Sequence, residues 1–315
     1  MRAIERECRS EPKVSVIMNC LNGEKYVRTA IESVYAQSYA NWEIIFLDNA
    51  STDGTPAIAR GYDTKLRYLR NESIVPLGAA RNQALKQASG EFIAFLDSDD
   101  FWFPNKLEKQ IPLFSGRPNI GLVFSDTELH FQATGVITTY FRNHQYKPPR
   151  GWIFPALLKH YSIPMPTAVI RVEALRSMDQ WFDDRYQVCD DFDFFMRLAY
   201  DWECDYLDAT LASCLIHGEA VTFRMHQYGP GEMAQTIEKF RTRHADFEQR
   251  FGDEVGAFLK QVSYKQGKSY WLEGKNRAAR QEFGRHFFSP KFLLSYLATF
   301  FPYPAIERIA RLLRR

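Results

Sequence analysis

The 315-residue sequence lacks paired cysteines, a long apolar run and a strong net charge. Its five cysteines are odd in number and show no C-x-x-C spacing, which argues against a disulfide framework or a zinc site and fits a reducing compartment. No run reaches the roughly 18 apolar residues of a membrane span. The first residues, MRAIERECRSEPK, are charged and contain no apolar core of a secretory signal. We therefore expect a cytoplasmic protein.

The charges are almost balanced. The chain has 40 Lys and Arg against 38 Asp and Glu, a formal net charge of +2. Without an overall basic field, binding to nucleic acid is not expected. With 45% hydrophobic residues the chain can bury a full core, so we expect one large domain, or one domain with an appendage.

Apolar runs alternate with helical patterns in the first half of the chain. The predicted strands cover residues 14–18, 43–47, 66–69 and 91–96. The predicted helices cover residues 27–34, 55–60, 78–89 and 104–114. Such alternation predicts an α/β fold with a mostly parallel sheet, because consecutive parallel strands need crossover helices.

The second half has a different pattern. Residues 120–131 and 136–141 predict two strands joined by a turn, so the sheet is expected to become mixed there. Residues 211–216 form another apolar stretch. A predominantly helical pattern begins after residues 228–231, a Gly- and Pro-containing break in the pattern. We predict a first domain over residues 1–228 and a C-terminal helical region over residues 229–315.

The most informative stretch is residues 90–110, GEFIAFLDSDDFWFPNKLEKQ. Asp97, Ser98, Asp99 and Asp100 follow directly where the predicted strand ends, and ligands bind at the carboxyl ends of strands in such sheets. Carboxylates crowded so closely repel one another unless a cation neutralises them, and oxygen donors suit Mg²⁺ or Mn²⁺ shared with a phosphate group. Capping of the next helix would explain one acid, but not three. The stretch therefore predicts a metal and diphosphate site.

Two further acidic positions stand out. Asp48 ends the predicted strand at residues 43–47, so it is expected at the same edge of the sheet. Asp190 and Asp191 open a predicted helix. An isolated acidic pair at a helix start is more often explained by the helix dipole than by catalysis.

Five segments, in this order, resemble those of glycosyltransferase family 2 enzymes with a GT-A fold, over roughly residues 13–222. They are VSVIMNCLNGEKYV, DNASTDGT at residues 48–55, GAARN at 78–82, FLDSDDFWFPNKLEKQ, and CDDFDFFMRLA at 189–199. The resemblance implies a Rossmann-like, mostly parallel mixed sheet flanked by helices. Residues 13–115 would be its nucleotide-sugar half and residues 116–228 its acceptor half.

The resemblance also implies an activity. Such enzymes are inverting and metal-dependent, and this one would move a sugar from a UDP- or dTDP-linked donor to a hydroxyl of a glycan or lipid-linked acceptor, as in cell-surface polysaccharide biosynthesis. A non-catalytic nucleotide-sugar or glycan binding module with a degenerate site is the alternative.

The resemblance assigns roles to the acids. Asp48 would bind the pyrimidine base, and Asp99 would bind Mn²⁺ or Mg²⁺, with His217 completing the metal shell. The remaining donor-binding positions are Asn19, Asn22, Arg81, Asp97 and Ser98.

Two departures from the family pattern bear on these roles. Leu215 replaces a basic residue that is common two positions before His217, and a lone histidine after an apolar strand is often structural. Asn19, Cys20 and Leu21 stand where Pro-Thr-Tyr is usual, which affects the contacts with the base.

The same resemblance places the catalytic base in the second acid cluster. Asp191 would accept the proton of the acceptor hydroxyl as it attacks the anomeric carbon, with Asp190 as the second choice. Direct attack from the face opposite the diphosphate gives inversion.

The C-terminal end lies outside the resemblance. Residues 305–315 predict a helix with Ile306, Ile309, Ala310 and Leu313 on one face and arginines on another, after an aromatic segment. Basic amphipathic helices with aromatics favour anionic membrane surfaces, here the inner face of the cell membrane. Packing on the catalytic domain or against a homodimer partner is an equal alternative.

Overall fold

The computed structural model describes residues 11–144 and 146–306. Within them the chain divides into two compact units. The first comprises the residues up to Ile153, Ser162–Arg185 and Phe194–His217. The second comprises Phe154–Tyr161, Tyr186–Asp193 and the residues from Gly218 onward. The predicted boundary after residue 228 stays a prediction.

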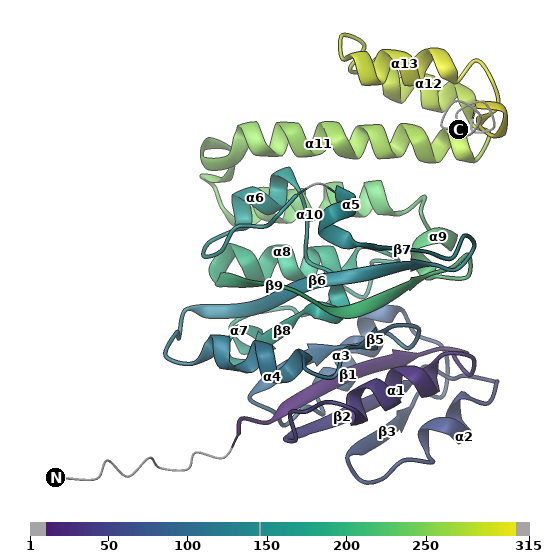
Figure 1. Ribbon diagram of the computed structural model, residues 1–315. Helices are drawn as coiled ribbons and strands as arrows, with labels where there is room; N and C mark the ends of the chain where they lie inside the picture. Colours follow the sequence, from purple (N-terminus) through teal and green to yellow (C-terminus); the bar gives the residue numbers. More distant parts are fainter. Residues whose placement is uncertain (1–10, 145, 307–315) are drawn as a thin grey trace. The chain divides into compact units, whose positions relative to one another are not determined.

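The first unit is built on a nine-stranded sheet (Figure 1). Its strand order is β3-β2-β1-β4-β8-β6-β9-β5, with β7 paired to β6. The strands are β1 (Val14–Cys20), β2 (Trp42–Asp48), β3 (Leu66–Arg70), β4 (Phe92–Phe95), β5 (Phe101–Trp102), β6 (Ile120–Phe131), β7 (Val136–Thr139), β8 (Val169–Arg171) and β9 (Glu203–Ile216).

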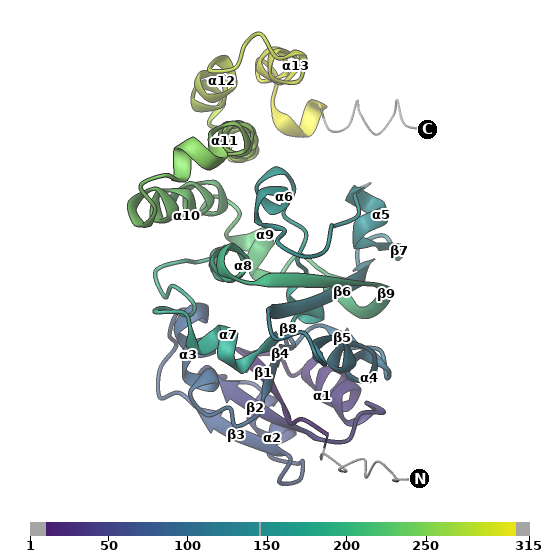
Figure 2. The same ribbon diagram turned by 90° about the vertical axis from the view of Figure 1, so that its left-hand side faces the viewer.

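The parallel part of the sheet is confirmed. β1 pairs in parallel with β2 and with β4, and β2 pairs in parallel with β3. Every residue of β1 is buried, which explains its continuous apolar sequence, since helices cover both faces of a parallel sheet. In Figure 2, α1 and α4 lie on one side of these strands, and α3 and α7 lie on the other.

The second half of the sheet is mixed, as predicted. β8 is antiparallel to β4 and to β6, whereas β6 and β9 run parallel to each other. The apolar stretch at residues 211–216 is the end of the longer strand β9.

The helices of the first unit are short. They are α1 (Val27–Tyr35), α2 (Thr55–Ala59), α3 (Leu77–Leu85), α4 (Lys106–Gln110), α5 (Tyr140–His144) and α7 (Val172–Arg176), with 3₁₀ turns η1 (Ile111–Phe114) and η2 (Met165–Thr167). Helix α8 (Asp190–Asp201) has its first four residues in the second unit.

Three predicted elements were wrong in their bounds. The helix expected over residues 78–89 ends at Leu85. The helix expected over residues 104–114 begins at Lys106 and passes into a 3₁₀ turn at Ile111. The strand expected over residues 136–141 ends at Thr139, and helix α5 begins at the next residue. The late start of the helix expected over residues 104–114 has a structural reason. Phe101–Trp102, just before it, form strand β5, which pairs with β9. This partner is more than 100 residues away in the chain, so the local sequence does not reveal it.

The second unit is helical, which confirms the pattern predicted from residue 229. Its helices are α6 (Phe154–Lys159), α9 (Val221–Arg224), α10 (Gly229–Arg243), α11 (Phe247–Leu272), α12 (Asn276–Gly284) and α13 (Pro290–Ala298). Phe154 from the middle of the chain packs against Phe240, Phe247 and Phe251, with ring centroids 5.0–6.1 Å apart. No described helix is long and apolar enough to cross a membrane. Most of the basic helix predicted over residues 305–315 lies outside the described residues.

One buried charge in the first unit is unusual. Lys106 is fully buried, and its Nζ has no hydrogen-bond partner among the described residues. The ammonium group lies 4.2 Å from the centre of the Trp102 ring, a favourable contact that replaces only part of its hydration. Burial lowers the pKa of Lys106 well below its ordinary value.

We expect Lys106→Met to stabilise the fold by about 1–3 kcal/mol, because methionine fills similar space without an unpaired polar group. At neutral pH the lysine is protonated in the unfolded state, whereas burial disfavours the protonated form in the folded state, and this difference lowers the free energy of unfolding. The loss disappears as the pH rises towards about 10, where the unfolded state also releases the proton. The gain should therefore be largest near pH 7 and smaller at pH 9.5. Urea unfolding at both pH values measures it. Lys109→Met, at an exposed position of the same helix, is the control; an equal gain there would contradict the explanation.

Candidate active site

The loops that follow β1 and β2 are joined to each other. The side-chain oxygen of Asn22 accepts from the Thr52 N–H at 2.8 Å, and the Asn22 N–H donates to the Ser51 hydroxyl at 2.9 Å. The Gly23 N–H donates to the Thr55 hydroxyl at 2.9 Å. Asn22 has φ 55°, a left-handed conformation that asparagine tolerates. Asn22 therefore shapes the carboxyl edge of the sheet.

Asp48 is fully buried at the end of β2. Its carboxylate accepts from the Ser51 N–H at 2.8 Å and from the Tyr68 hydroxyl at 2.6 Å, and it forms an ion pair with Arg70. Both carboxylate oxygens thus have partners within the chain. The contact of Asp48 with a nucleotide base stays a prediction. Sequence reasoning did not single out Tyr68 and Arg70, although both lie on the neighbouring strand β3.

Arg81 contacts two other predicted donor-binding residues, Asn19 and Asp97. Arg81 is buried in α3, and its guanidinium donates to Asp97 Oδ1 at 2.9 Å. With the Asn19 amide oriented to suit its neighbours, its oxygen accepts from the Arg81 N–H at 2.9 Å. Arg81 therefore links the end of β1 to the acids after β4. Ser98 is half-buried beside them.

Asp99 and His217 lie together, although they are 118 residues apart in the chain. His217 Nε2 and Asp99 Oδ2 are 2.9 Å apart. The fold achieves this because β9, which ends just before His217, pairs along its length with β6 and also with β5. The two residues predicted to bind a metal are thus adjacent in the structure.

The acids after β4 carry negative charge that is only partly compensated. Burial raises the pKa of Asp99, and the charge of Asp97 raises it further. Asp100 is buried, and its carboxylate accepts from the Leu215 N–H at 3.0 Å. Burial and the neighbouring acids raise the pKa of Asp100 well above its ordinary value. A bound cation would relieve this repulsion.

The residues present fit a divalent ion that is shared with a substrate. Among the described residues, no group of three or more His, Cys, Asp or Glu side chains could hold a metal ion alone. Asp99 and His217 offer an oxygen and a nitrogen donor side by side. Mg²⁺ and Mn²⁺ sites commonly combine one or two protein ligands with phosphate oxygens and water. Such an ion would need the diphosphate to complete its coordination.

The second acid cluster belongs to the second unit. Helix α8 begins at Asp190, as predicted. Asp190 is 2% exposed, whereas Asp191 is partly exposed and accepts from the Phe192 N–H at 2.7 Å. Of the two carboxylates, that of Asp191 is the more accessible.

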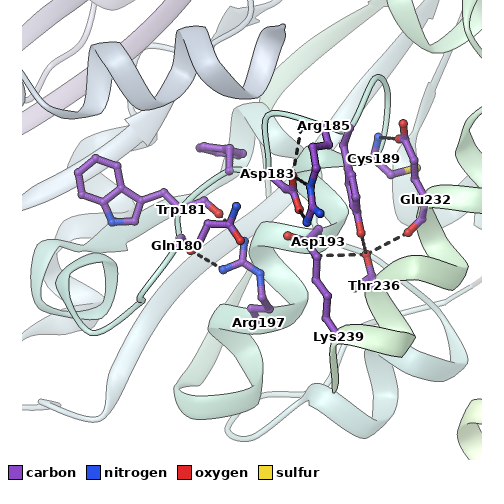
Figure 3. A network of polar contacts seen from close by, with 12 residues as sticks. Gln180, Trp181, Asp183, Arg185, Cys189, Asp193, Arg197, Glu232, Thr236 and Lys239 are labelled. Atoms are coloured by element: carbon purple, nitrogen blue, oxygen red, sulfur yellow. Dashed lines mark hydrogen bonds and ion pairs between the residues drawn. The ribbon is translucent and has the colours of Figure 1, made fainter. Parts of the chain in front are cut away.

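Sequence reasoning also missed Glu232 and Lys239 of α10, which contact the segment around this acid pair (Figure 3). The sequence did contain a signal for this polar face of the helix. Glu232 and Lys239 are seven residues apart with Thr236 between them, a spacing that places all three side chains on one face.

Comparisons with known proteins show the family of this chain. Residues 15–170 match the family described as glycosyl transferase family 2. "Uncharacterized glycosyltransferase MJ1057" of Methanocaldococcus jannaschii is 30% identical over 207 residues, 64% of this chain and 70% of that protein. The chain belongs to glycosyltransferase family 2.

A second relative carries a more specific name. The "UDP-Glc:alpha-D-GlcNAc-diphosphoundecaprenol beta-1,3-glucosyltransferase WfgD" of Escherichia coli is 44% identical over 117 residues. The match covers 37% of this chain and 46% of WfgD. The chain matches less than half the length of the first curated relatives.

Two solved structures show the same fold at low sequence identity. S. aureus TarS 1–349 in complex with UDP-GlcNAc is 20% identical with a TM-score of 0.56, covering 91% of this chain and 90% of TarS. The mannosyltransferase PcManGT from Pyrobaculum calidifontis, in complex with GDP-Man and Mn²⁺, is 16% identical with a TM-score of 0.61, covering 96% of this chain and 80% of PcManGT. The predicted GT-A fold with additional C-terminal helices is confirmed.

If Asp99 binds a metal together with a diphosphate, Asp99→Asn should abolish the metal dependence of nucleotide binding. The measurement is thermal unfolding with UDP, dTDP, GDP or CDP, each with Mn²⁺ and with EDTA. A ligand at about 100 times its dissociation constant adds roughly 2.7 kcal/mol, a shift of a few degrees. Asp208→Asn, at an exposed carboxylate of the same unit, should keep the wild-type response. An unchanged Mn²⁺-dependent shift in Asp99→Asn would remove Asp99 from the metal site.

Proposed function

We propose that this chain is an inverting, metal-dependent glycosyltransferase. It transfers a sugar from a UDP- or dTDP-linked donor to a hydroxyl of a glycan or lipid-linked acceptor in cell-surface polysaccharide biosynthesis. The observation that carries the proposal is the adjacency of Asp99 and His217 beside the Arg81–Asp97 ion pair, at the carboxyl edge of a sheet of this family.

The donor class rests on a relative and on charge. WfgD is named for a UDP-glucose donor, and its match spans 117 residues at 44% identity. In this chain the acids after β4 can hold a cation, which a nucleoside diphosphate can share. Arg81 lies beside them, and a guanidinium forms strong, directional hydrogen bonds with phosphate oxygens.

Each residue has a part in the proposed mechanism. Asp99 and His217 would hold Mn²⁺ or Mg²⁺, which supplies Lewis-acid stabilisation of the diphosphate leaving group when bound. Arg81 orients Asp97 and adds positive charge where negative charge develops during transfer. Asn19, Asn22 and Asp48 hold the loops that would enclose the nucleoside.

Asp191 is the proposed catalytic base. Its side chain is partly exposed, whereas Asp190 is buried, so Asp191 is better placed to reach an acceptor hydroxyl. It takes the hydroxyl proton as the oxygen attacks the anomeric carbon and the bond to the diphosphate breaks. A binding module would not need this group.

Asp191→Asn should lower turnover by roughly 10²- to 10⁴-fold while leaving nucleotide affinity nearly unchanged, because it removes only the proton acceptor. Steady-state transfer with the donor identified by thermal unfolding measures turnover, and titration measures affinity. Asp201→Asn, at the exposed far end of α8, is the matched control. Wild-type turnover in Asp191→Asn would move the base to Asp190 or elsewhere.

The C-terminal helices suggest where the enzyme works. Phe288 is fully exposed, and five other large apolar side chains between residues 287 and 301 are more than 40% exposed. These are Phe287, Leu294, Leu297, Phe300 and Phe301. One basic side chain, Lys291, lies within this segment, and Arg285 lies two residues before it. An anionic membrane surface fits this combination, and WfgD is named for a diphosphoundecaprenol-linked acceptor.

The double substitution Phe288→Ser with Phe301→Ser should weaken binding to anionic vesicles by about tenfold or more, because each aromatic contributes apolar area to the interface. Co-sedimentation with phosphatidylglycerol vesicles measures it. Ile137→Ser, at an exposed apolar position in the first unit, is the control. Unchanged binding would remove this surface from the interaction, and concentration-dependent self-association of the wild type without vesicle binding would favour a homodimer.

A further inference from the structure

One face of helix α10 contacts the segment that leads into the predicted base. Gly229, Glu232, Thr236 and Lys239 recur at three- and four-residue spacings along α10, so they share a face. All four contact residues 186–193, which belong to the same compact unit. This face of α10 lies beyond the residues matched by the family, which end at 170.

Glu232 makes the most specific of these contacts. Its Oε1 accepts from the Gln187 N–H at 2.6 Å, and its Oε2 accepts from the N–H groups of Val188 and Cys189 at 3.0 and 2.8 Å. Glu232 is only 6% exposed, so its carboxylate depends on these donors. A single buried carboxylate thus holds three consecutive backbone N–H groups directly before Asp190. Figure 3 shows Glu232 beside Cys189, the last of the three.

The contacts continue into the first turn of α8. The Asp193 N–H donates to the Cys189 carbonyl at 3.0 Å, which begins the helical hydrogen bonding. The buried Asp193 carboxylate accepts from Lys239 Nζ at 2.6 Å and from the Thr236 hydroxyl at 3.3 Å. Asp190 and Asp191 therefore lie between two anchored points, residues 187–189 and residue 193.

We propose that Glu232 is a positioning residue, which acts by fixing the backbone that carries Asp191. The inference rests on the proposed role of Asp191 as the base. Backbone N–H groups of an irregular segment need partners when they are buried, and charge-assisted hydrogen bonds to a carboxylate are the strong kind. Without Glu232 the segment would lose three such bonds at once, and the base would no longer be held in one place.

Glu232→Gln tests this role, because glutamine keeps the size of the side chain but loses the charge and one acceptor oxygen. Amide hydrogen exchange at Gln187, Val188 and Cys189 should become faster. Turnover should fall about 10- to 100-fold, as expected when a catalytic group moves by about 1 Å, with the donor dissociation constant unchanged.

Glu282→Gln is the matched control. Glu282 is also a buried glutamate of the second unit, but it accepts from Ser263 and Arg285 within the C-terminal helices. It should lower stability without changing exchange at residues 187–189 or turnover. If Glu232→Gln does not fold, Glu232→Asp keeps the charge with a shorter reach, and Thr236→Val removes only the hydroxyl; each should give a smaller loss of turnover.

The outcomes separate the two hypotheses. Unchanged amide exchange in Glu232→Gln, or faster exchange with wild-type turnover, overturns the positioning role. If the Asn variants of both Asp190 and Asp191 retain full turnover, the base assignment fails, while the exchange measurement still reports whether Glu232 holds the segment. A loss of donor affinity in place of turnover would also overturn the proposal.

Discussion

Crowded negative charge at the end of β4 is the constraint on which the rest of the site depends. Asp97, Asp99 and Asp100 come within four residues, and each has a different partner. Asp97 is paired with Arg81 from α3, Asp100 accepts a backbone N–H from β9, and Asp99 faces His217. These partners come from two distant parts of the chain, helix α3 and the end of β9. The order of strands in the sheet is therefore what makes the acid cluster tolerable, and a shared cation would complete the compensation.

The pairing of Asp99 with His217 shows how far sequence could reach. The resemblance to the family predicted that they belong together, but nothing local to either residue does, because their adjacency follows from the pairing of β9 with β5 and β6. The short strand β5 was missed for the same reason. Two residues carry little pattern of their own, and their pairing with Ala212 and Ser213 decides their conformation.

Contacts to the backbone were the least predictable part. Glu232 binds three backbone N–H groups that any residue except proline would supply at positions 187–189, so the residue types there do not reveal the contact. The partners of Asp48 were missed differently. Tyr68 and Arg70 are two residues apart on β3, and their side chains can donate hydrogen bonds to a carboxylate. Only the register of β3 against β2 identifies them as neighbours of Asp48. The fold class and the main acidic residues could be predicted from the sequence. The residues that hold these acids in place could be identified only from the three-dimensional structure.

The interleaving of the two units affects how the chain is made. Residues 186–193 leave the ribosome well before Glu232, which lies 43 residues after Cys189. At translation rates of about 5–20 residues per second, their N–H groups wait a few seconds for the carboxylate. During this interval residues 187–189 of the nascent chain have no hydrogen bonds to Glu232. The second unit therefore assembles only after translation has passed α10, and a gene fragment limited to the family-matching residues would encode neither side of this contact.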